Sequence, residues 1–268
     1  MKKTVLFLAS VLTAAMAFVG CKKNSGLDNS LENLQKNGEF VLGLDDSFPP
    51  MGFRDENNEI VGFDIDLAKE VASRLGVTFR AQPINWDAKE QELSTGNIDC
   101  IWNGLTITEE RLSMLSFTKP YLANEQVLVV RKDSGIASLA DLAGKTVGLQ
   151  AGSSAADALD GAADFKATLK NVVEFKENIT ALNDLEIGGV DAVVMDKVVA
   201  DYSIVTTGKP FSVLDQGLAP EDYGVAFRKN DVKLTEAVQK ILEEMKADGT
   251  VEKISTKWFG SDITVIGK

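Results

Sequence analysis

Short apolar runs alternate with amphipathic segments along most of the chain. Seven runs rich in aliphatic and aromatic residues predict strands at 40–44, 78–82, 98–102, 127–131, 146–149, 172–175 and 192–195. The segments between these runs carry apolar residues three or four positions apart, as amphipathic helices do. Strands and helices that alternate in this way predict an α/β fold with largely parallel sheets.

Two of the predicted helices have the clearest periodicity. Phe63, Leu67, Val71 and Leu75 recur every four residues and form one apolar helical face. Residues 234–245 have the same spacing, and the glycine at position 249 is expected to end that helix. Each helix is therefore expected to bury one side against a sheet.

An internal repeat divides the predicted fold in two. Residues 96–102 and 188–194 share a glycine, an aliphatic residue and an aspartate, followed by an apolar strand. In each copy the glycine is expected to end a helix, and the strand to run into a β-to-α loop. Because such loops form the ligand crevices of open α/β sheets, functional residues are expected at 103–111 and at Asp196.

The N-terminal segment has the pattern of a secretory signal. Lys2 and Lys3 precede an apolar run at 5–19 that ends before Cys21. This run is shorter than the roughly 18 to 20 residues that a membrane-spanning helix needs, so residues 1–20 are predicted to be a signal peptide.

Cys21 follows a small residue and precedes a polar stretch, as the lipid-modified cysteine of a bacterial lipoprotein does. We predict that Cys21 is lipidated, that residues 21–37 are a tether, and that the protein is extracytoplasmic and bound to the membrane only through this anchor. The alternative is cleavage that leaves a free thiol. The other cysteine, Cys100, lies in a predicted strand and is expected to be a buried hydrophobic residue.

Composition excludes several classes of function. The formal net charge is −12, which disfavours nucleic acid and anionic lipid as partners. The chain has no histidine, which excludes histidine-based metal sites and Ser-His-Asp catalysis. No metal, cofactor or catalytic residue is predicted.

Arg111 is the first candidate binding residue. It lies in a predicted first helical turn behind Thr108, where a cation opposes the helix dipole by about 0.3–1 kcal/mol. An anion is therefore expected to meet it, and its planar fork suits a carboxylate, with Thr106 as a further donor. The alternative is a surface arginine paired with a neighbouring glutamate.

Two more segments complete a possible site. Gly152, Ser153 and Ser154 open a predicted helix, where hydroxyl and N–H groups can meet an anion, although Ser154 with Asp157 also resembles an ordinary capping box. Asp196 ends a predicted strand, where it binds an ammonium group or caps the next helix. Together with Arg111, these segments predict a site for a zwitterion.

At this point the chain resembles the polar-amino-acid-binding proteins of ABC importers, similar to the lysine/arginine/ornithine-, histidine- and glutamine-binding proteins. The resemblance extends over about residues 39 to 260 and is carried by 62–75, 104–111, 117–121, 152–154, 191–196 and 248–250. It implies a type II periplasmic-binding-protein fold, with two crossing strands near 123–126 and 217–223 as a hinge. Lobe one would hold 38–124 and 222–268, and lobe two 125–221. The implied partners are a free amino acid and permease subunits, and the implied state is a monomer.

The resemblance also implies roles for single residues. Arg111 and Thr106, helped by Ser153 or Ser154, would hold the α-carboxylate. Asp196 would hold the α-ammonium, with a backbone carbonyl from Gly104.

The side chain of the ligand would meet other residues. Phe48 and Trp86 would flank it, with core packing as their alternative, and Asn103 stands where relatives often have serine, so its role is open. Asp45 or Asp46 favours a lysine or arginine ligand. Gln150 equally favours glutamine or another polar side chain.

Two other functions compete with capture for import. Some relatives of the resembled family are dehydratases, for which Asp45, Asp46 or Asp87 would be the candidate acid. A sensory ligand-binding module is the second alternative.

Overall fold

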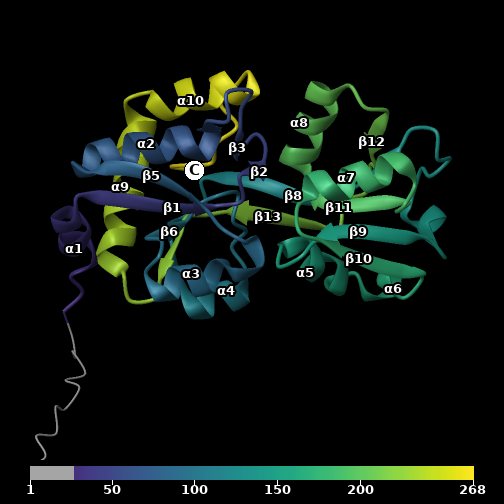
Figure 1. The fold of residues 1–268 in the computed structure, drawn as a ribbon, viewed down its shortest axis with the longest axis horizontal. Coiled ribbons are helices and arrows are strands. Elements are labelled where there is room, and N and C mark those ends of the chain that lie inside the picture. Colours follow the sequence, from purple (N-terminus) through teal and green to yellow (C-terminus); the bar gives the residue numbers. More distant parts are fainter. Residues whose placement is uncertain (1–26) are drawn as a thin grey trace, which may run out of the picture.

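The structure, a computed structural model, describes residues 27–268 as two α/β units, each built on its own sheet (Figure 1). The predicted signal peptide and Cys21 lie outside the described residues. We use "first lobe" for the sheet that contains β1 together with α1–α4, α9 and α10. We use "second lobe" for the sheet that contains β9 together with α5–α8.

The sheet of the first lobe has the strand order β5–β1–β6–β14–β7. These strands are Thr78–Pro83, Glu39–Leu44, Cys100–Ile101, Ala226–Arg228 and Leu115–Phe117. β5 and β6 run parallel to β1, whereas β14 runs antiparallel to β6 and β7. A small antiparallel sheet of β2 (Ser47–Phe48), β3 (Gly52–Arg54) and β4 (Ile60–Val61) follows β1.

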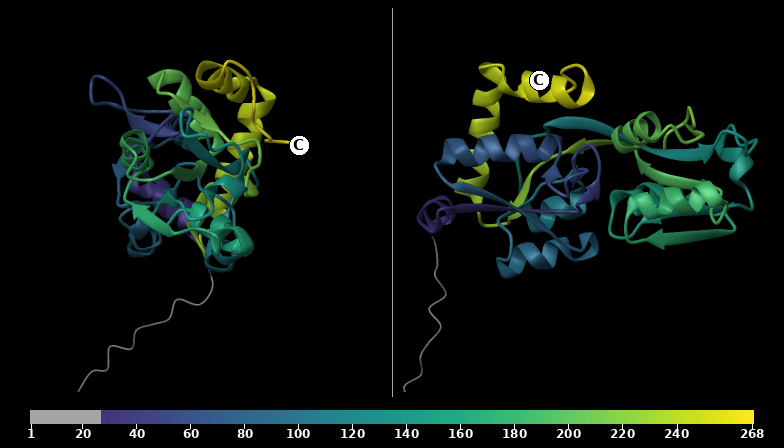
Figure 2. Two further views of the ribbon diagram at one scale, coloured as in Figure 1. Left: turned by 90° about the vertical axis from the view of Figure 1, so that its right-hand side faces the viewer. Right: turned by 45° about the horizontal axis from the view of Figure 1, so that its top comes forward.

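Helices cover both faces of this sheet (Figures 1 and 2). The helices α2 (Phe63–Leu75), α9 (Val232–Ala247) and α10 (Thr250–Phe259) pack together on one side. On the other side lie α3 (Lys89–Thr95), preceded by a 3-10 turn at Trp86–Ala88, and α4 (Glu109–Met114). The two helices with clear periodicity in the sequence are α2 and α9, and the apolar face of each is buried.

The sheet of the second lobe has the order β10–β9–β11–β8–β12. These strands are Asn171–Phe175, Thr146–Gln150, Ala192–Asp196, Leu122–Arg131 and Phe211–Val213. Its helices are α5 (Ser154–Gly161), α6 (Ala163–Lys166), α7 (Asn178–Ile187) and α8 (Lys197–Thr207), and Leu139–Leu142 form a 3-10 turn. β9 runs parallel to both neighbours, and β8 runs antiparallel to β11. Each main sheet is thus parallel in part only.

Two antiparallel strands connect the lobes. β8 pairs with β13 (Ala219–Tyr223) from Leu122↔Tyr223 to Gln126↔Ala219. The strand predicted at 127–131 therefore begins earlier, because the crossing segment joins it without a break. The crossing strands meet where the resemblance places a hinge.

The sequence repeat corresponds to the same local structure in both lobes. Asp99 accepts a hydrogen bond from the Val41 amide at 2.9 Å, and Asp191 accepts one from the Thr146 amide at 2.9 Å. In return, the amides of the two aspartates donate to the carbonyls of Val41 and Thr146 at 2.8 Å in each case. Each aspartate thereby fixes the start of one strand against its neighbour. Cys100, which follows the first aspartate, is fully buried as predicted.

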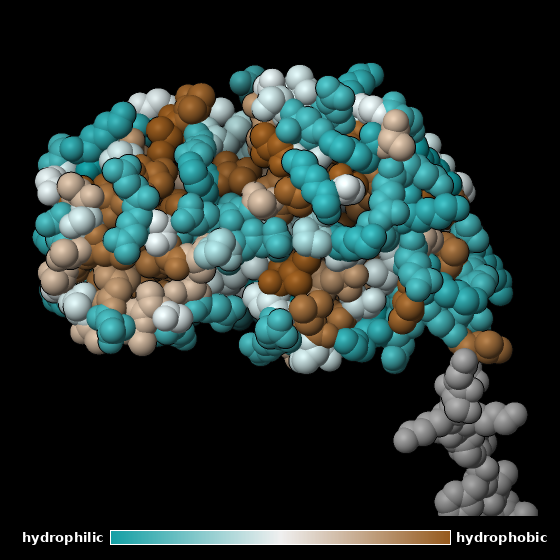
Figure 3. Space-filling model, turned by 180° about the vertical axis from the view of Figure 1, so that it is seen from behind, coloured by the Kyte–Doolittle hydropathy of each residue, from teal (hydrophilic) through white to brown (hydrophobic). Residues whose placement is uncertain are grey.

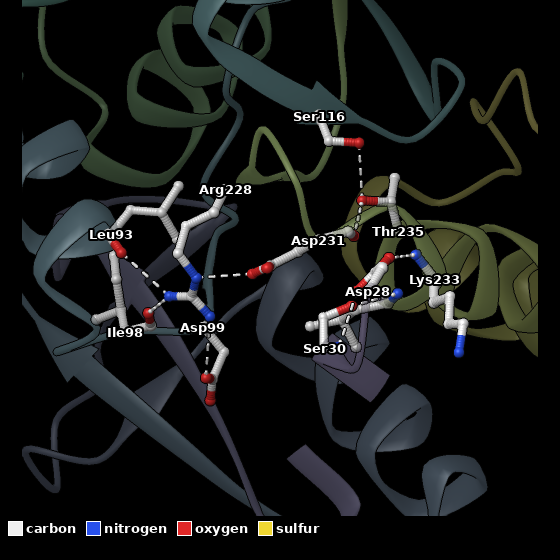
Figure 4. Close-up of polar contacts among 11 residues, drawn as sticks. Asp28, Ser30, Leu93, Ile98, Asp99, Ser116, Arg228, Asp231, Lys233 and Thr235 are labelled. Atoms are coloured by element: carbon white, nitrogen blue, oxygen red, sulfur yellow. Dashed lines mark hydrogen bonds and ion pairs between the residues drawn. The ribbon is translucent and has the colours of Figure 1, made fainter. Parts of the chain in front are cut away.

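The prediction of a tether over 21–37 is wrong for its last part, because Ser30–Asn37 form the helix α1. Leu34 of this helix is buried in the main core. Asp28 and Ser30 accept hydrogen bonds from the amides of Lys233 and Leu234, at the start of α9. Figure 4 shows this junction beside the Arg228 and Asp231 pair. Asp28, before α1, and Ser30, its first residue, therefore accept from free amides at the start of the distant helix α9.

One face of the molecule is drawn by residue hydropathy in Figure 3. On the face drawn in Figure 3, apolar residues form separate groups between polar ones. Within residues 27–268, no helix combines the length and the apolar character needed to cross a membrane.

Candidate functional site

A cavity lies between the two lobes. All ten residues that the sequence analysis proposed as ligand contacts line it, and Gln150 lines it as well. The lining residues are Asp45, Phe48, Trp86, Asn103, Gly104, Thr106, Arg111, Gln150, Ser153, Ser154 and Asp196.

The lining residues come together because strands end there. Asp45 follows β1, Asn103 lies two residues past the end of β6, Gln150 is the last residue of β9, and Asp196 is the last residue of β11. β1 and β6 run parallel in one sheet, and β9 and β11 run parallel in the other. Parallel strands present their carboxyl ends at one edge of a sheet, so each lobe contributes one such edge to the cavity.

Arg111 forms the cationic end of the cavity. Its backbone amide donates to Thr108 Oγ1, which caps α4 as predicted. Arg111 is 8% exposed, and its guanidinium donates to the carbonyl of Thr106 at 2.9 Å and to that of Gly152 at 3.4 Å. Both hydrogen bonds go to main-chain carbonyls, so the alternative of a surface arginine paired with a glutamate is wrong. The charge is buried and available to an anion in the cavity.

The start of α5 faces Arg111 from the second lobe. Ser153, and not Ser154, caps this helix, because its Oγ accepts from the Ala155 amide at 3.3 Å. The expected capping box at Ser154 is therefore wrong. Instead, the Ser154 hydroxyl lies 3.0 Å from that of Thr106, which joins the lobes.

Asp196 forms the anionic end. It is 5% exposed, and its side chain makes no capping bond to α8, so the capping alternative is also wrong. Its Oδ1 accepts from Asn124 at 2.8 Å, Gln126 at 3.0 Å and the Tyr223 hydroxyl at 2.6 Å. Burial raises the pKa of Asp196 to about 7, and the nearby carboxylate of Glu221 acts in the same direction.

Glu221 is a second acid at this end and was missed by the sequence analysis. Its Oε2 accepts from Thr106 at 3.1 Å, Asn124 at 3.1 Å and Gln126 at 3.0 Å. Asp196 is buried and Glu221 is half-buried, and two neighbouring carboxyl groups favour a cation as partner, because it relieves the repulsion between their negative charges. Asn124 and Gln126 lie on the crossing strand β8, and Glu221 lies on the crossing strand β13.

Asp45 occupies a third corner of the cavity. It accepts from the Ser47 amide at 2.9 Å and hydroxyl at 2.7 Å, and from Gln150 Nε2 across the lobes at 2.7 Å. Burial raises its pKa, against the effect of these hydrogen bonds. Asp46 does not line the cavity and pairs with Arg54 at 2.6 Å, so of these two acids only Asp45 faces the cavity.

The remaining lining residues are largely buried. Phe48 is 5% exposed and Trp86 is 7% exposed. Asn103 accepts from the Asp45 amide at 3.1 Å, while its Nδ2 has no partner among the described residues. Gly104 has φ of +59°, and a Cβ there would lie 3.0 Å from Phe48 and from Tyr223. Its amide donates to the buried carboxylate of Asp64 at 2.8 Å, which fixes this loop.

Metal binding would require several ligating side chains close together among the described residues. In the part of the chain that the structure describes, no group of three or more cysteine, aspartate or glutamate side chains could hold a metal ion. The cavity is lined by the guanidinium of Arg111 and by the carboxyl groups of Asp45 and Asp196.

Known proteins with the same architecture were identified by comparison. The model of the bacterial extracellular solute-binding proteins, family 3, matches residues 40–261. The histidine-binding periplasmic protein of Escherichia coli is 33% identical over 276 residues, which cover 98% of this chain and 99% of that protein. The L-cystine-binding protein TcyJ of Escherichia coli is 29% identical over 265 residues, with 96% of each chain covered.

A solved structure is similar over nearly the same range. The substrate-binding protein of an ABC uptake transporter from Streptococcus pneumoniae, with bound histidine, superposes with a TM-score of 0.82 at 38% identity. The match covers 89% of this chain and 98% of that one. The predicted type II periplasmic-binding-protein fold is confirmed, and the chain belongs to family 3 of the bacterial extracellular solute-binding proteins.

Proposed function

We propose that this protein captures a free polar amino acid between its lobes outside the cytoplasmic membrane and delivers it to an ABC importer. One observation carries the proposal: a buried guanidinium and a buried carboxylate, Arg111 and Asp196, line one small cavity from opposite lobes. Free amino acids are zwitterions with a matching pair of charges.

The contacts across the lobes explain how capture would work. The Thr106–Ser154 and Asp45–Gln150 hydrogen bonds join residues of different lobes. A ligand that touches both sides stabilises the closed arrangement, because only there can Arg111 hold the carboxylate while Asp196 holds the ammonium. An importer would recognise this closed form.

For the ligand side chain we propose a polar, preferentially basic group. Asp45 presents a buried carboxylate beside Phe48 and Trp86, which supply apolar walls for an aliphatic stem. Gln150 beside it keeps glutamine and other polar ligands as alternatives. The relatives named above bind histidine and cystine, which are also polar amino acids.

The proposal includes the organisation of the chain. We assign residues 38–124 and 222–268 to lobe one, residues 125–221 to lobe two, and lipidation to Cys21, with the protein acting as a monomer. Mass spectrometry of the membrane-associated protein tests the lipid directly, since a diacylated N-terminal cysteine has a defined added mass.

The alternative function as a dehydratase has one supporting feature: the pKa of Asp45 is raised, as that of a catalytic acid would be. Both carboxylate oxygens of Asp45 are already hydrogen-bonded to Ser47 and Gln150, which suits a fixed binding group better than a proton donor. Incubation with prephenate or arogenate, followed by product analysis, separates the two readings.

Thermal melting with amino acids tests the proposed function. The protein without residues 1–26 is refolded to remove ligand carried through purification, and each of the twenty amino acids and cystine is then added. A ligand at about a thousand times its dissociation constant adds about 4 kcal/mol, or about 8–16 °C at about 2–4 °C per kcal/mol. We expect the largest rises with arginine and lysine. If no amino acid raises the melting temperature of the cooperatively folded protein, the proposed function is wrong.

Affinity is expected to fall as the pH decreases below about 7. Burial raises the pKa of Asp196 to about 7, so below that pH the ligand-free protein holds a proton there. An ammonium group favours the carboxylate, so binding must expel this proton, and the dissociation constant should rise by up to about tenfold per pH unit. Titration calorimetry with arginine between about pH 5.5 and 7.5, in buffers of different ionisation enthalpy, measures both effects. Equal affinity across this range without proton release would show that Asp196 is already ionised in the ligand-free protein.

A further inference from the structure

A buried lysine lies behind the carboxylate end of the cavity. Lys89, the first residue of α3, is only 3% exposed although it belongs to a polar segment. Burial lowers its pKa, and the positive charge of Arg111 acts in the same direction. A buried ammonium is costly unless each of its protons finds an acceptor, so its partners indicate what it does.

The partners of Lys89 belong to both lobes. Its Nζ lies 3.3 Å from the Trp86 carbonyl and 3.2 Å from the Glu90 carboxylate, both in the first lobe. The shortest contact, 2.8 Å, is to the carbonyl of Gly152 in the second lobe. Three acceptors account for the three N–H groups of an ammonium, and Lys89 is not among the residues that line the cavity. It therefore has no donor left for a ligand.

Gly152 fits against the same segment of the first lobe. A Cβ at this position would lie 2.9 Å from Asp87 Oδ1 and 3.0 Å from Asp87 Cα. Its φ of +69° also lies in the region that favours glycine. Figure 1 shows α3 and α4 of the first lobe facing α5 of the second lobe at this place. The absence of a side chain thus permits close approach of the two backbones when the lobes are together.

The carbonyl of Gly152 also accepts from Arg111 at 3.4 Å, and the next residue is Ser153, the cap of α5. Two cations of the first lobe therefore hold one carbonyl of the second lobe, directly beside the hydroxyl groups of the cavity. Separation of the lobes breaks the Lys89–Gly152 contact, whereas the contacts with Trp86 and Glu90 remain possible within the first lobe.

We propose that Lys89 is a positioning residue that stabilises the closed arrangement through the Gly152 carbonyl, and so slows release of the bound amino acid without selecting it. This inference rests on the proposed function. Charge-assisted hydrogen bonds that form only in the closed state lower the dissociation rate, while the first encounter with ligand occurs in the open state and is little affected.

The test compares dissociation and association rates in stopped-flow experiments with whichever of arginine, lysine, histidine and cystine binds the wild type most tightly. Lys89→Met keeps the length of the side chain and removes its charge, and it should raise the dissociation rate about 10- to 100-fold while association changes less than about threefold. Gly152→Ala, which acts on the other side of the contact, should also speed dissociation. Lys229→Met is the matched control, because Lys229 donates to the Leu112 carbonyl within the first lobe alone.

Further readouts separate this role from a purely structural one. The order of preference among the four amino acids should stay the same, and the melting temperature of ligand-free Lys89→Met should not fall, since a costly buried charge is removed. Wild-type dissociation in both the Lys89 and Gly152 variants would overturn this inference and leave the proposed function intact. If none of the twenty amino acids and cystine binds the wild type, both this inference and the proposed function are wrong.

Discussion

Replacement of Asp196 by alanine is expected to weaken amino-acid binding by about two to four decades. Removal of one partner of a buried charge pair costs about 3–5 kcal/mol, because the ligand ammonium would be left without a counter-charge. Asp196 is 5% exposed and is held by Asn124, Gln126 and Tyr223, so water cannot readily replace its carboxylate. Asp196→Asn, which preserves the shape, should lose most of the same affinity.

Titration calorimetry at about pH 7.5 measures this effect. Asp201→Ala is the matched control, because Asp201 lies on α8, which directly follows Asp196, and pairs with Lys197 at the surface. An N-acetylated amino acid, which has no ammonium, should bind the wild type and the Asp196 variant equally poorly. An affinity of Asp196→Ala within tenfold of the wild type would remove Asp196 from the site.

Arg111→Ala is expected to have an effect of similar size at the other end of the ligand. The guanidinium is buried and donates to two main-chain carbonyls, which hold its plane for a carboxylate. Arg111→Lys keeps the charge but loses the planar fork, so it should recover only part of the affinity. Loss of the buried charge again costs about 3–5 kcal/mol.

A double-mutant cycle identifies which ligand group Arg111 meets. The amide of the amino acid, which has no carboxylate, should bind the wild type weakly and lose little more in Arg111→Ala. Arg80→Ala is the control, since Arg80 lies on the surface and pairs with Glu39. Full additivity of the two changes would show that Arg111 and the carboxylate do not interact.

The cavity-lining positions at 103–111 and at Asp196 follow from local sequence and sheet geometry, whereas Phe48 and Trp86 are implied by the family resemblance alone. The Gly-x-aliphatic-Asp repeat defines the strands that end at Asn103 and Asp196, and parallel strands place such ends at one edge. Ser154 shows the limit of this reasoning, because the sequence suggests it as a capping residue, whereas in the structure it contacts Thr106 of the other lobe. A helix start was predicted correctly, but which serine caps it depends on a backbone angle at Ser153 that the sequence leaves open.

Other parts of the site depend on contacts between distant segments. Glu221 and Tyr223 reach the cavity end because β13 pairs with β8, and no periodicity in either segment indicates that register. The sequence around Lys89 is typical of an exposed polar helix, whereas in the structure its Nζ contacts the Gly152 carbonyl of the second lobe. The sequence predicts a tether at α1 because the residues that this segment contacts lie at the start of α9, about 200 positions further along the chain.

The central claim is that one amino acid lies between Arg111 and Asp196 with its two charged groups held by different lobes. A crystal structure of the refolded protein with the amino acid that gives the largest thermal shift tests it most directly. We expect the α-carboxylate at hydrogen-bond distance from the Arg111 guanidinium and the α-ammonium at hydrogen-bond distance from Asp196. A ligand bound in the reverse orientation, or outside the cavity between the lobes, would contradict the account.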